Sequence, residues 1–199
     1  LNSAKILLHS VNFAPIEKLQ HEGNWQQTAD ILSDAARSLE KGGADCVLIC
    51  TNTMHKVAAL VQEAVSIPLI HIADATGQKL IQNKVNKVGL IGTAFTMEQA
   101  FYKGRLQDKF GLDVIVPNEE QRQLVHQVIY QELCLGKVLP ESKQAYLQIV
   151  AELKNQGAEG IILGCTEIGL LISGEDTDIN LYDTVEIHAK AAVDWALAE

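Results

Sequence analysis

The sequence predicts an α/β fold made of two pseudo-symmetric domains, each with a parallel sheet covered by helices. Short runs rich in β-branched residues alternate with segments whose apolar residues recur at helical spacing, a pattern typical of βαβ units. Two stretches of eleven residues, one in each half, also match each other without a gap. A chain of 199 residues with 47% hydrophobic residues is long enough to bury the cores of such domains.

The expected strands are short apolar runs, and the expected helices lie between them. Strands are predicted at residues 5–8, 46–49, 69–72, 88–91, 114–116 and 180–183, and in the run that precedes Cys165. Helices are predicted around residues 31–39 and 146–153, at about 119–135, and after residue 93, where Thr96 and Gln99 have the spacing of a capping box. Glycines follow several of these helices, as is common at helix C-termini.

The internal repeat aligns residues 43–53 with residues 157–167. In this register Thr51 corresponds to Cys165, and Cys50 corresponds to Gly164. The first half has no counterpart of the strand, glycine turn and helix that begin at residue 87. We therefore expect an opening β–α unit of roughly 30 residues, which can carry site residues, to be absent from this sequence.

The repeat also sets the expected domain boundaries. Residues 1–84 would form the first α/β domain, which lacks its opening β–α unit, and residues 85–184 would form the second. Residues 185–199 are expected to form a C-terminal helix that packs back on the first domain.

Composition excludes several classes of function. The formal charge of −9, from 16 basic and 25 acidic residues, argues against binding to nucleic acid or to an anionic membrane. No apolar run approaches the roughly 20 residues that span a bilayer, so we expect a cytoplasmic location. The four cysteines have neither the density of a disulfide scaffold nor the spacing of a zinc site.

Cys165 is the strongest catalytic candidate. Ligands of parallel α/β sheets bind beyond the C-terminal strand ends, and Cys165 follows an apolar strand and precedes the polar pair Thr166 and Glu167. A buried cysteine is commonly just a small hydrophobe. At a strand end near a helix N-terminus, however, a lowered pKa and more thiolate character are expected. Cys50 and Thr51 compete for the equivalent place in the first half, and the repeat favours Thr51.

Other polar residues near strand ends are candidates for binding a carboxylate. Their side chains and the nearby backbone N–H groups can donate hydrogen bonds, although simple helix capping is an alternative for each. These residues are Asn52, Thr53, Thr93, Thr96 and Thr166. No pair of histidines has a helical metal-site spacing, and His9, His55, His71 and His188 are interpreted as structural or exposed. Met54 and Met97 are interpreted as core residues, and Asp74 and Asp183 as turn or cap residues.

Three segments resemble the aspartate/glutamate racemase family. They are residues 51–55 (Thr-Asn-Thr-Met-His), residues 164–168 (Gly-Cys-Thr-Glu-Ile) and residues 92–102. The resemblance covers essentially the whole chain and is closest to the broad-specificity or aspartate/glutamate-specific branch. It implies two α/β domains with the site in the cleft between them, no pyridoxal phosphate and no metal, and two opposed proton carriers that are commonly cysteines.

The resemblance also assigns roles to individual residues. Cys165 is the second proton carrier, and Thr51 occupies the place where the family usually has the first cysteine. The α-carboxylate or amino group would be held by Asn52, Thr53, Thr93 and Thr166, with Thr96 and Glu167 also expected at the substrate. Lys137 would meet a side-chain carboxylate, although it reads equally well as a cation at a helix C-terminus.

The expected function is therefore racemisation of aspartate, glutamate or a broader set of amino acids by proton transfer at Cα. A decarboxylase or cis-trans isomerase of a small diacid on the same scaffold is an alternative, as is a non-catalytic amino-acid-binding protein. The expected partner is a small-molecule amino acid rather than nucleic acid or a membrane, and a homodimer is left open.

Overall fold

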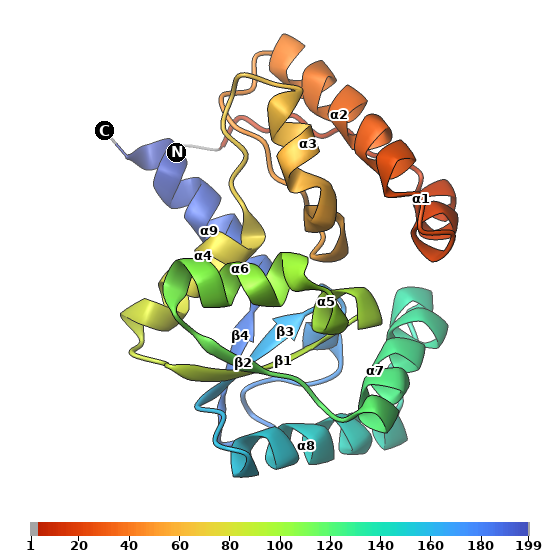
Figure 1. Cartoon of the computed structure of the whole chain (residues 1–199), viewed down its shortest axis with the longest axis vertical. Helices are drawn as coiled ribbons and strands as arrows, with labels where there is room; N and C mark the ends of the chain where they lie inside the picture. The colour runs from red at the N-terminus through yellow and green to blue at the C-terminus, as the bar shows by residue number, and fades with distance from the viewer. Residues whose placement is uncertain (1–3, 199) are drawn as a thin grey trace. The chain divides into compact units, whose positions relative to one another are not determined.

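The computed structural model describes residues 4–198, which form two compact units (Figure 1). The first unit comprises the described residues up to Ile49 together with Met54–His71. The second comprises Cys50–Thr53 and the described residues from Ile72 onward. The expected boundary at residue 84 and the observed one differ over α4 (Ile72–Gln82), which belongs to the second unit because it packs on α6 (Ala100–Phe110) and α9 (Thr184–Leu197).

The second unit contains a parallel four-stranded sheet in the order β2-β1-β3-β4 (Figure 1). Its strands are β1 (Lys87–Gly92), β2 (Asp113–Ile115), β3 (Gly160–Gly164) and β4 (Asn180–Asp183), which confirms the expected strands of the second half. The remaining helices of this unit are α5 (Ala94–Glu98), α7 (Glu119–Gln131), η2 (Leu133–Leu135), α8 (Pro140–Asn155) and η3 (Ile168–Leu170). The expected α/β fold with a parallel sheet is therefore present.

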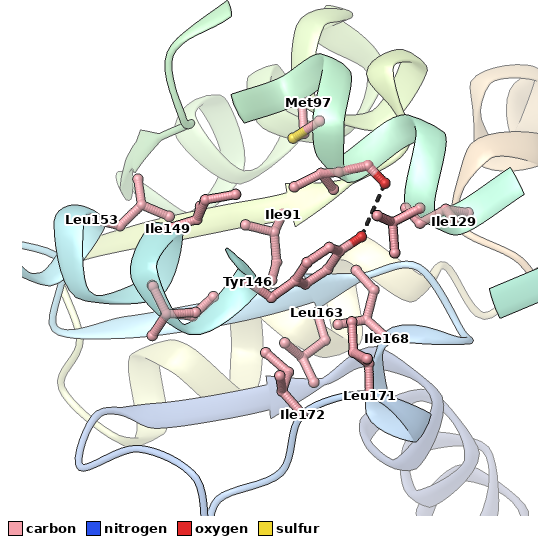
Figure 2. Close-up of a cluster of buried hydrophobic side chains, with 14 of the residues drawn as sticks. Ile91, Met97, Ile129, Tyr146, Ile149, Leu153, Leu163, Ile168, Leu171 and Ile172 are labelled. Atoms are coloured by element: carbon pink, nitrogen blue, oxygen red, sulfur yellow. Dashed lines mark hydrogen bonds between the residues drawn. The ribbon is translucent and has the colours of Figure 1, made fainter. Parts of the chain in front are cut away.

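Strand residues alternate between two cores, one on each face of the sheet. Ile161 and Leu163 of β3 enter a core built with α7 and α8, whereas Ile162 between them enters a core built with α4 and α6. This is the period-2 alternation of a strand that is covered on both faces. In the first core the Tyr146 hydroxyl donates to the Val125 carbonyl at 2.9 Å (Figure 2). The buried hydroxyl of this tyrosine therefore has a hydrogen-bond partner.

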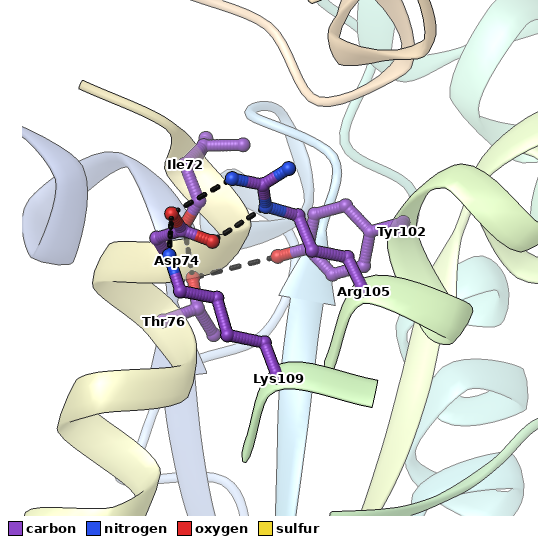
Figure 3. A network of polar contacts seen from close by, with 6 residues as sticks. All are labelled: Ile72, Asp74, Thr76, Tyr102, Arg105 and Lys109. Atoms are coloured by element: carbon purple, nitrogen blue, oxygen red, sulfur yellow. Dashed lines mark hydrogen bonds and ion pairs between the residues drawn. The ribbon is translucent and has the colours of Figure 1, made fainter. Parts of the chain in front are cut away.

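Asp74 lies on the face of the sheet that α4 and α6 cover, and it forms ion pairs with two basic side chains. Arg105 donates to both of its carboxylate oxygens, and Lys109 donates to one of them at 2.6 Å (Figure 3). Below this ion pair the buried Tyr102 hydroxyl donates to Thr76 at 3.4 Å. Asp74 lies inside the first turn of α4 as an ion-pair partner, whereas the sequence had favoured a turn or cap residue.

The first unit consists of α1 (Phe13–His21), α2 (Trp25–Lys41), α3 (Ala58–Glu63) and most of η1 (Thr53–Val57). Its two expected inner strands are reduced to one parallel bridge between Val47 and Leu69. The expected strand at residues 5–8 was wrong. A strand needs a hydrogen-bonding neighbour, no described segment pairs with these residues, and Ile6 and Leu8 are 79% and 83% exposed.

Helix termini refine the expected boundaries. The expected capping box of Thr96 and Gln99 was wrong, because Thr93 is the N-cap of α5 and accepts from the Thr96 N–H. Asp183 caps α9 by accepting from the Val185 N–H at 2.8 Å, in agreement with its interpretation as a cap residue. Among the described residues, no helix combines the length and apolarity needed to cross a membrane.

Candidate functional site

The site is built at the carboxyl ends of three adjacent strands. Thr93 follows β1, Cys165 follows β3 and Thr184 follows β4. Gly92 and Gly164 are partners in the register of β1 and β3, and a Cβ added at Gly92 would lie 2.7 Å from the Gly164 carbonyl oxygen. Only glycine permits this close approach of the two strands. Thr93 and Cys165 therefore leave the sheet side by side.

A segment from the first half of the sequence crosses this edge. The side-chain amide of Asn52 donates to the Thr184 hydroxyl at 3.0 Å, and the Thr53 hydroxyl lies 3.0 Å from that of Thr93. Because β3 lies between β1 and β4, Asn52 and Thr53 span the end of β3, from which Cys165 emerges. Residues 52 and 53 thus lie in the same unit as Cys165, more than one hundred residues away in sequence.

Three buried threonines form a hydroxyl cluster at this edge. The oxygen of Thr93 lies 3.0 Å from that of Thr53 and 3.2 Å from that of Thr96, and the Thr53 and Thr96 oxygens are 3.5 Å apart. Each hydroxyl can rotate to donate its single proton elsewhere. The cluster is therefore able to present neutral donors to an anion such as a carboxylate.

Asn52 carries an unsatisfied acceptor. The residue is 2% exposed, and its Oδ1 has no hydrogen-bond partner among the described residues. An unpaired buried acceptor costs about 1–3 kcal/mol. An orphan atom of this kind, on the residue that precedes Thr53 of the hydroxyl cluster, indicates a place for a ligand with a hydrogen-bond donor.

The thiol of Cys165 is hydrogen-bonded to a carboxylate. Its thiol donates to Oε2 of Glu167 at 2.9 Å, and the Thr166 hydroxyl donates to the same oxygen at 2.8 Å. Burial, followed by the negative charge of Glu167 and this hydrogen bond, raises the pKa of the Cys165 thiol well above its usual range. The expected lowering of this pKa was wrong, because η3 spans only three residues and a carboxylate lies where a cation would be needed.

The surroundings of Cys165 include groups that the sequence did not single out. Burial and the charge of Glu167 raise the pKa of Cys134, and burial followed by the charges of Cys165 and Glu132 raises the pKa of Tyr146. The Glu132 carboxylate accepts from the buried Ser142 hydroxyl at 2.6 Å. Thr184 was also missed, although its place directly after a strand that ends in a capping aspartate was a usable signal.

The remaining predicted site residues are more exposed to solvent. Thr51 is half-buried and Cys50 is exposed, and a Thr51 that faces Cys165 stays a prediction. Lys137 is exposed and follows Gly136, which ends η2 in the left-handed conformation. The Lys137 side chain makes no hydrogen bond or ion pair to a described residue. Met54 and Met97 are buried core residues, as expected.

The histidines divide between the two units. His55 and His71 are buried in the first unit, with ring centroids 4.5 Å apart. In the second unit His126 accepts the Ala94 N–H at 3.2 Å through Nδ1, next to the threonine cluster. This backbone contact gives His126 a structural role at the start of α5.

Comparisons with known proteins agree with the resemblance seen in the motifs. The Asp/Glu/Hydantoin racemase family model matches residues 2–192. The chain is 31% identical to the broad specificity amino-acid racemase RacX of Bacillus subtilis (strain 168) over 165 residues, which cover 83% of this chain and 70% of that protein.

Solved structures of similar proteins share the fold. A candidate Asp/Glu racemase from Yersinia pestis superposes with a TM-score of 0.93 at 50% identity, over 100% of this chain and 86% of that one. An aspartate racemase homologue from Pyrococcus horikoshii OT3 superposes with a TM-score of 0.83 at 34% identity, over 96% of this chain and 83% of that one. The chain belongs to the Asp/Glu/Hydantoin racemase family.

Proposed function

We propose that the chain carries the site of an amino-acid racemase that exchanges the Cα proton without a cofactor. The observation that carries this proposal is the position of Asn52 and Thr53 across the end of β3. One short segment thereby joins an orphan acceptor and a cluster of hydroxyl donors beside the thiol of Cys165. An α-amino acid offers an ammonium donor, a carboxylate acceptor and an acidic carbon, which are the three chemical counterparts of these groups.

The polar groups suggest how the substrate is held. The α-carboxylate would accept from the hydroxyls of Thr53, Thr93 and Thr96, and the α-ammonium would donate to Oδ1 of Asn52. When the Cα proton leaves, negative charge develops on the carboxylate oxygens as an enediolate forms. Preorganised hydroxyls at that position stabilise the developing charge without having to reorient in solvent.

Cys165 and Glu167 would move one of the protons. In the direction in which Cys165 is the base, Glu167 accepts the thiol proton and the resulting thiolate takes the proton from Cα, leaving the electron pair of that bond in the enediolate. In the other direction the thiol donates its proton to Cα, and the electron pair of the enediolate forms the new C–H bond. The raised thiol pKa favours the donor role at rest.

The second proton carrier and the substrate are proposed from the sequence and the relatives, since fewer contacts of the structure bear on them. Thr51 is the proposed carrier on the opposite face of Cα, since it precedes Asn52 directly. The proposed substrates are aspartate, glutamate or a broader set of amino acids, and RacX is named for broad specificity. Lys137 is proposed to meet a side-chain carboxylate, and its exposed side chain, which pairs with no described residue, is compatible with a role that begins when substrate arrives. A homodimer and a cytoplasmic location stay predictions.

Exchange at Cα tests this function directly. The protein is incubated in D2O with a panel of L- and D-amino acids, and loss of the Cα–H signal is followed by NMR. Cys165→Ser should abolish exchange of the L-enantiomers, whereas the matched change Cys50→Ser should retain it. No exchange with any amino acid would favour a binding protein, and loss of carbon dioxide from a small diacid would favour a decarboxylase.

A further inference from the structure

A buried chain of hydrogen bonds runs from β3 to the orphan atom of Asn52. The Thr184 hydroxyl donates to the Leu163 carbonyl at 2.9 Å, and the Asn52 amide nitrogen donates to the Thr184 oxygen at 3.0 Å. Thr184 is 0% exposed, and Leu163 and Asn52 are buried as well. The chain ends at Oδ1 of Asn52, which has no partner among the described residues.

The donor-to-acceptor direction of these hydrogen bonds is fixed at the end where the Leu163 carbonyl lies. A backbone carbonyl can only accept, so the single proton of the Thr184 hydroxyl is committed to Leu163. The Thr184 oxygen is then left only as an acceptor for a group on its other side. Asn52 must therefore present its NH2 to Thr184, and its carbonyl oxygen is turned the other way. Without this constraint the two ends of the amide would be nearly interchangeable in shape.

We propose that Thr184 is a positioning residue that locks the Asn52 amide with its oxygen toward the ligand, so that the site selects compounds with a donor nitrogen on Cα. This inference rests on the proposed function and adds a source of its substrate selectivity. A bound α-ammonium completes the chain by donating to Oδ1. An analogue that has hydrogen in place of the amino group leaves Oδ1 unpaired.

Loss of the Thr184 hydroxyl should weaken this selectivity. With valine at position 184, the Asn52 NH2 loses its acceptor, and the amide is free to turn and expose the NH2 to the site. A turned amide repels an ammonium and tolerates a ligand without one. Selectivity that depends on an unpaired buried group is commonly large, because the wrong ligand leaves that group without a partner.

Binding of a matched ligand pair tests the role of Thr184 without requiring turnover. The dissociation constants of L-aspartate and succinate, which differ at Cα only by the amino group, are measured by calorimetry for the unaltered protein, Thr184→Val and Thr184→Ser. We expect Thr184→Val to weaken L-aspartate binding about tenfold and succinate binding less than about twofold. Thr184→Ser, which keeps the hydroxyl, should restore the preference for L-aspartate.

A double-mutant cycle separates positioning from general damage. Asn52→Leu should remove the preference for L-aspartate, and Thr184→Val should then have no further effect on the ratio of the two dissociation constants. Equal weakening of both ligands in Thr184→Val, the same loss in Thr184→Ser, or no preference in the unaltered protein would overturn the inference. If Thr184→Val does not fold, Thr184→Ala is compared with Thr184→Ser in the same way.

The two proposals fail differently. Absence of Cα exchange in D2O, with the ligand preference and its dependence on Thr184 intact, would remove the racemase and leave an amino-acid site positioned by Thr184. Cα exchange together with a preference for L-aspartate that does not change in the Thr184 variants would keep the racemase and remove the positioning role of Thr184.

Discussion

The Cys165 thiol lies 2.9 Å from Oε2 of Glu167, and this contact holds the proton on sulfur. The two residues are separated by only Thr166, whose hydroxyl donates to the same carboxylate oxygen. Burial is the largest cause of the raised pKa of this thiol, and the nearby charge of Glu167 raises the pKa further. The resting site therefore contains a proton donor at Cys165 and its acceptor at Glu167.

The first prediction concerns the ionisation of Cys165. Glu167→Gln removes a negative charge, so the pKa of the thiol should fall toward its ordinary value and the thiolate fraction at a fixed, mildly alkaline pH should rise about tenfold per unit of that fall. Alkylation of the Cys165 peptide by iodoacetamide, followed by mass spectrometry, measures this fraction. The alkylation rate of Cys165 in the unaltered protein should rise with pH, since alkylation needs the thiolate.

Glu175→Gln is the matched control for this experiment, because Glu175 is an exposed carboxylate in another loop of the second unit. It should leave the alkylation rate of Cys165 unchanged. An unchanged rate in Glu167→Gln would mean that burial alone sets the pKa of the thiol, and Glu167 would lose its assigned role.

The second prediction concerns Thr93, which both caps α5 and belongs to the threonine cluster. Thr93→Val keeps the shape but removes the hydroxyl, so we expect the free energy of unfolding to fall by about 1 kcal/mol and the KM for the amino acid to rise about tenfold. Thr93→Ser should restore both. Denaturant unfolding and steady-state kinetics measure the two effects separately.

Asn118 offers a comparison that separates capping from binding. It closes a capping box at the start of α7. Asn118→Ala should cost a similar free energy of unfolding without a change in KM. If it raises KM as much as Thr93→Val does, the effect at Thr93 is loss of stability rather than loss of a substrate contact.

The sequence predicts those features that depend on local pattern. The apolar runs of β1, β3 and β4 and the glycines that end helices are visible in the chain itself, and the family follows from motifs around Thr51 and Cys165. Residues 5–8 have the same pattern but form no strand, because pairing depends on a neighbour that a local pattern does not contain.

Features that depend on long-range contact could not be predicted in this way. The place of Thr184 after a strand end is visible in the sequence, but its hydrogen bond from Asn52, 132 positions away, is not. The direction of the pKa shift at Cys165 was likewise missed, because burial and the orientation of the Glu167 side chain are properties of the folded chain. The position of Cys165 at a strand end was predictable, but its ionisation was not.

The third prediction is that exchange at Cα requires neither a metal nor pyridoxal phosphate. The sequence has no zinc-ligand spacing and no lysine in a recognisable Schiff-base context. Exhaustive dialysis against a chelator and hydroxylamine should leave the exchange rate within about twofold of that of the untreated protein. Loss of activity that returns on addition of a metal or of pyridoxal phosphate would contradict this prediction.

The last prediction concerns the direction of proton transfer, and it follows from the mismatch between Cys165 and Thr51. A threonine hydroxyl is a far poorer base than a thiolate, so an enantiomer that presents its Cα–H to Cys165 should exchange faster than its mirror image. In the family the cysteine of the second half is generally associated with the L-enantiomer, so we expect the L form to exchange faster. The equilibrium between enantiomers is fixed at equality in an achiral solvent, so the asymmetry has to lie in rates or in binding. Cys165→Ser should slow exchange from the L side by about a hundredfold or more.

Thr51→Cys should increase exchange from the D side, because it restores a thiol at the position that the internal repeat pairs with Cys165. Cys50→Ser is the control, since Cys50 is exposed and adjacent to Thr51 in the same segment. It should retain most exchange in both directions. Initial rates of Cα deuteration, measured separately from each enantiomer, distinguish these outcomes. Equal exchange rates from both enantiomers in the unaltered protein, or a strong loss of exchange in Cys50→Ser, would assign the second proton carrier to Cys50 instead of Thr51.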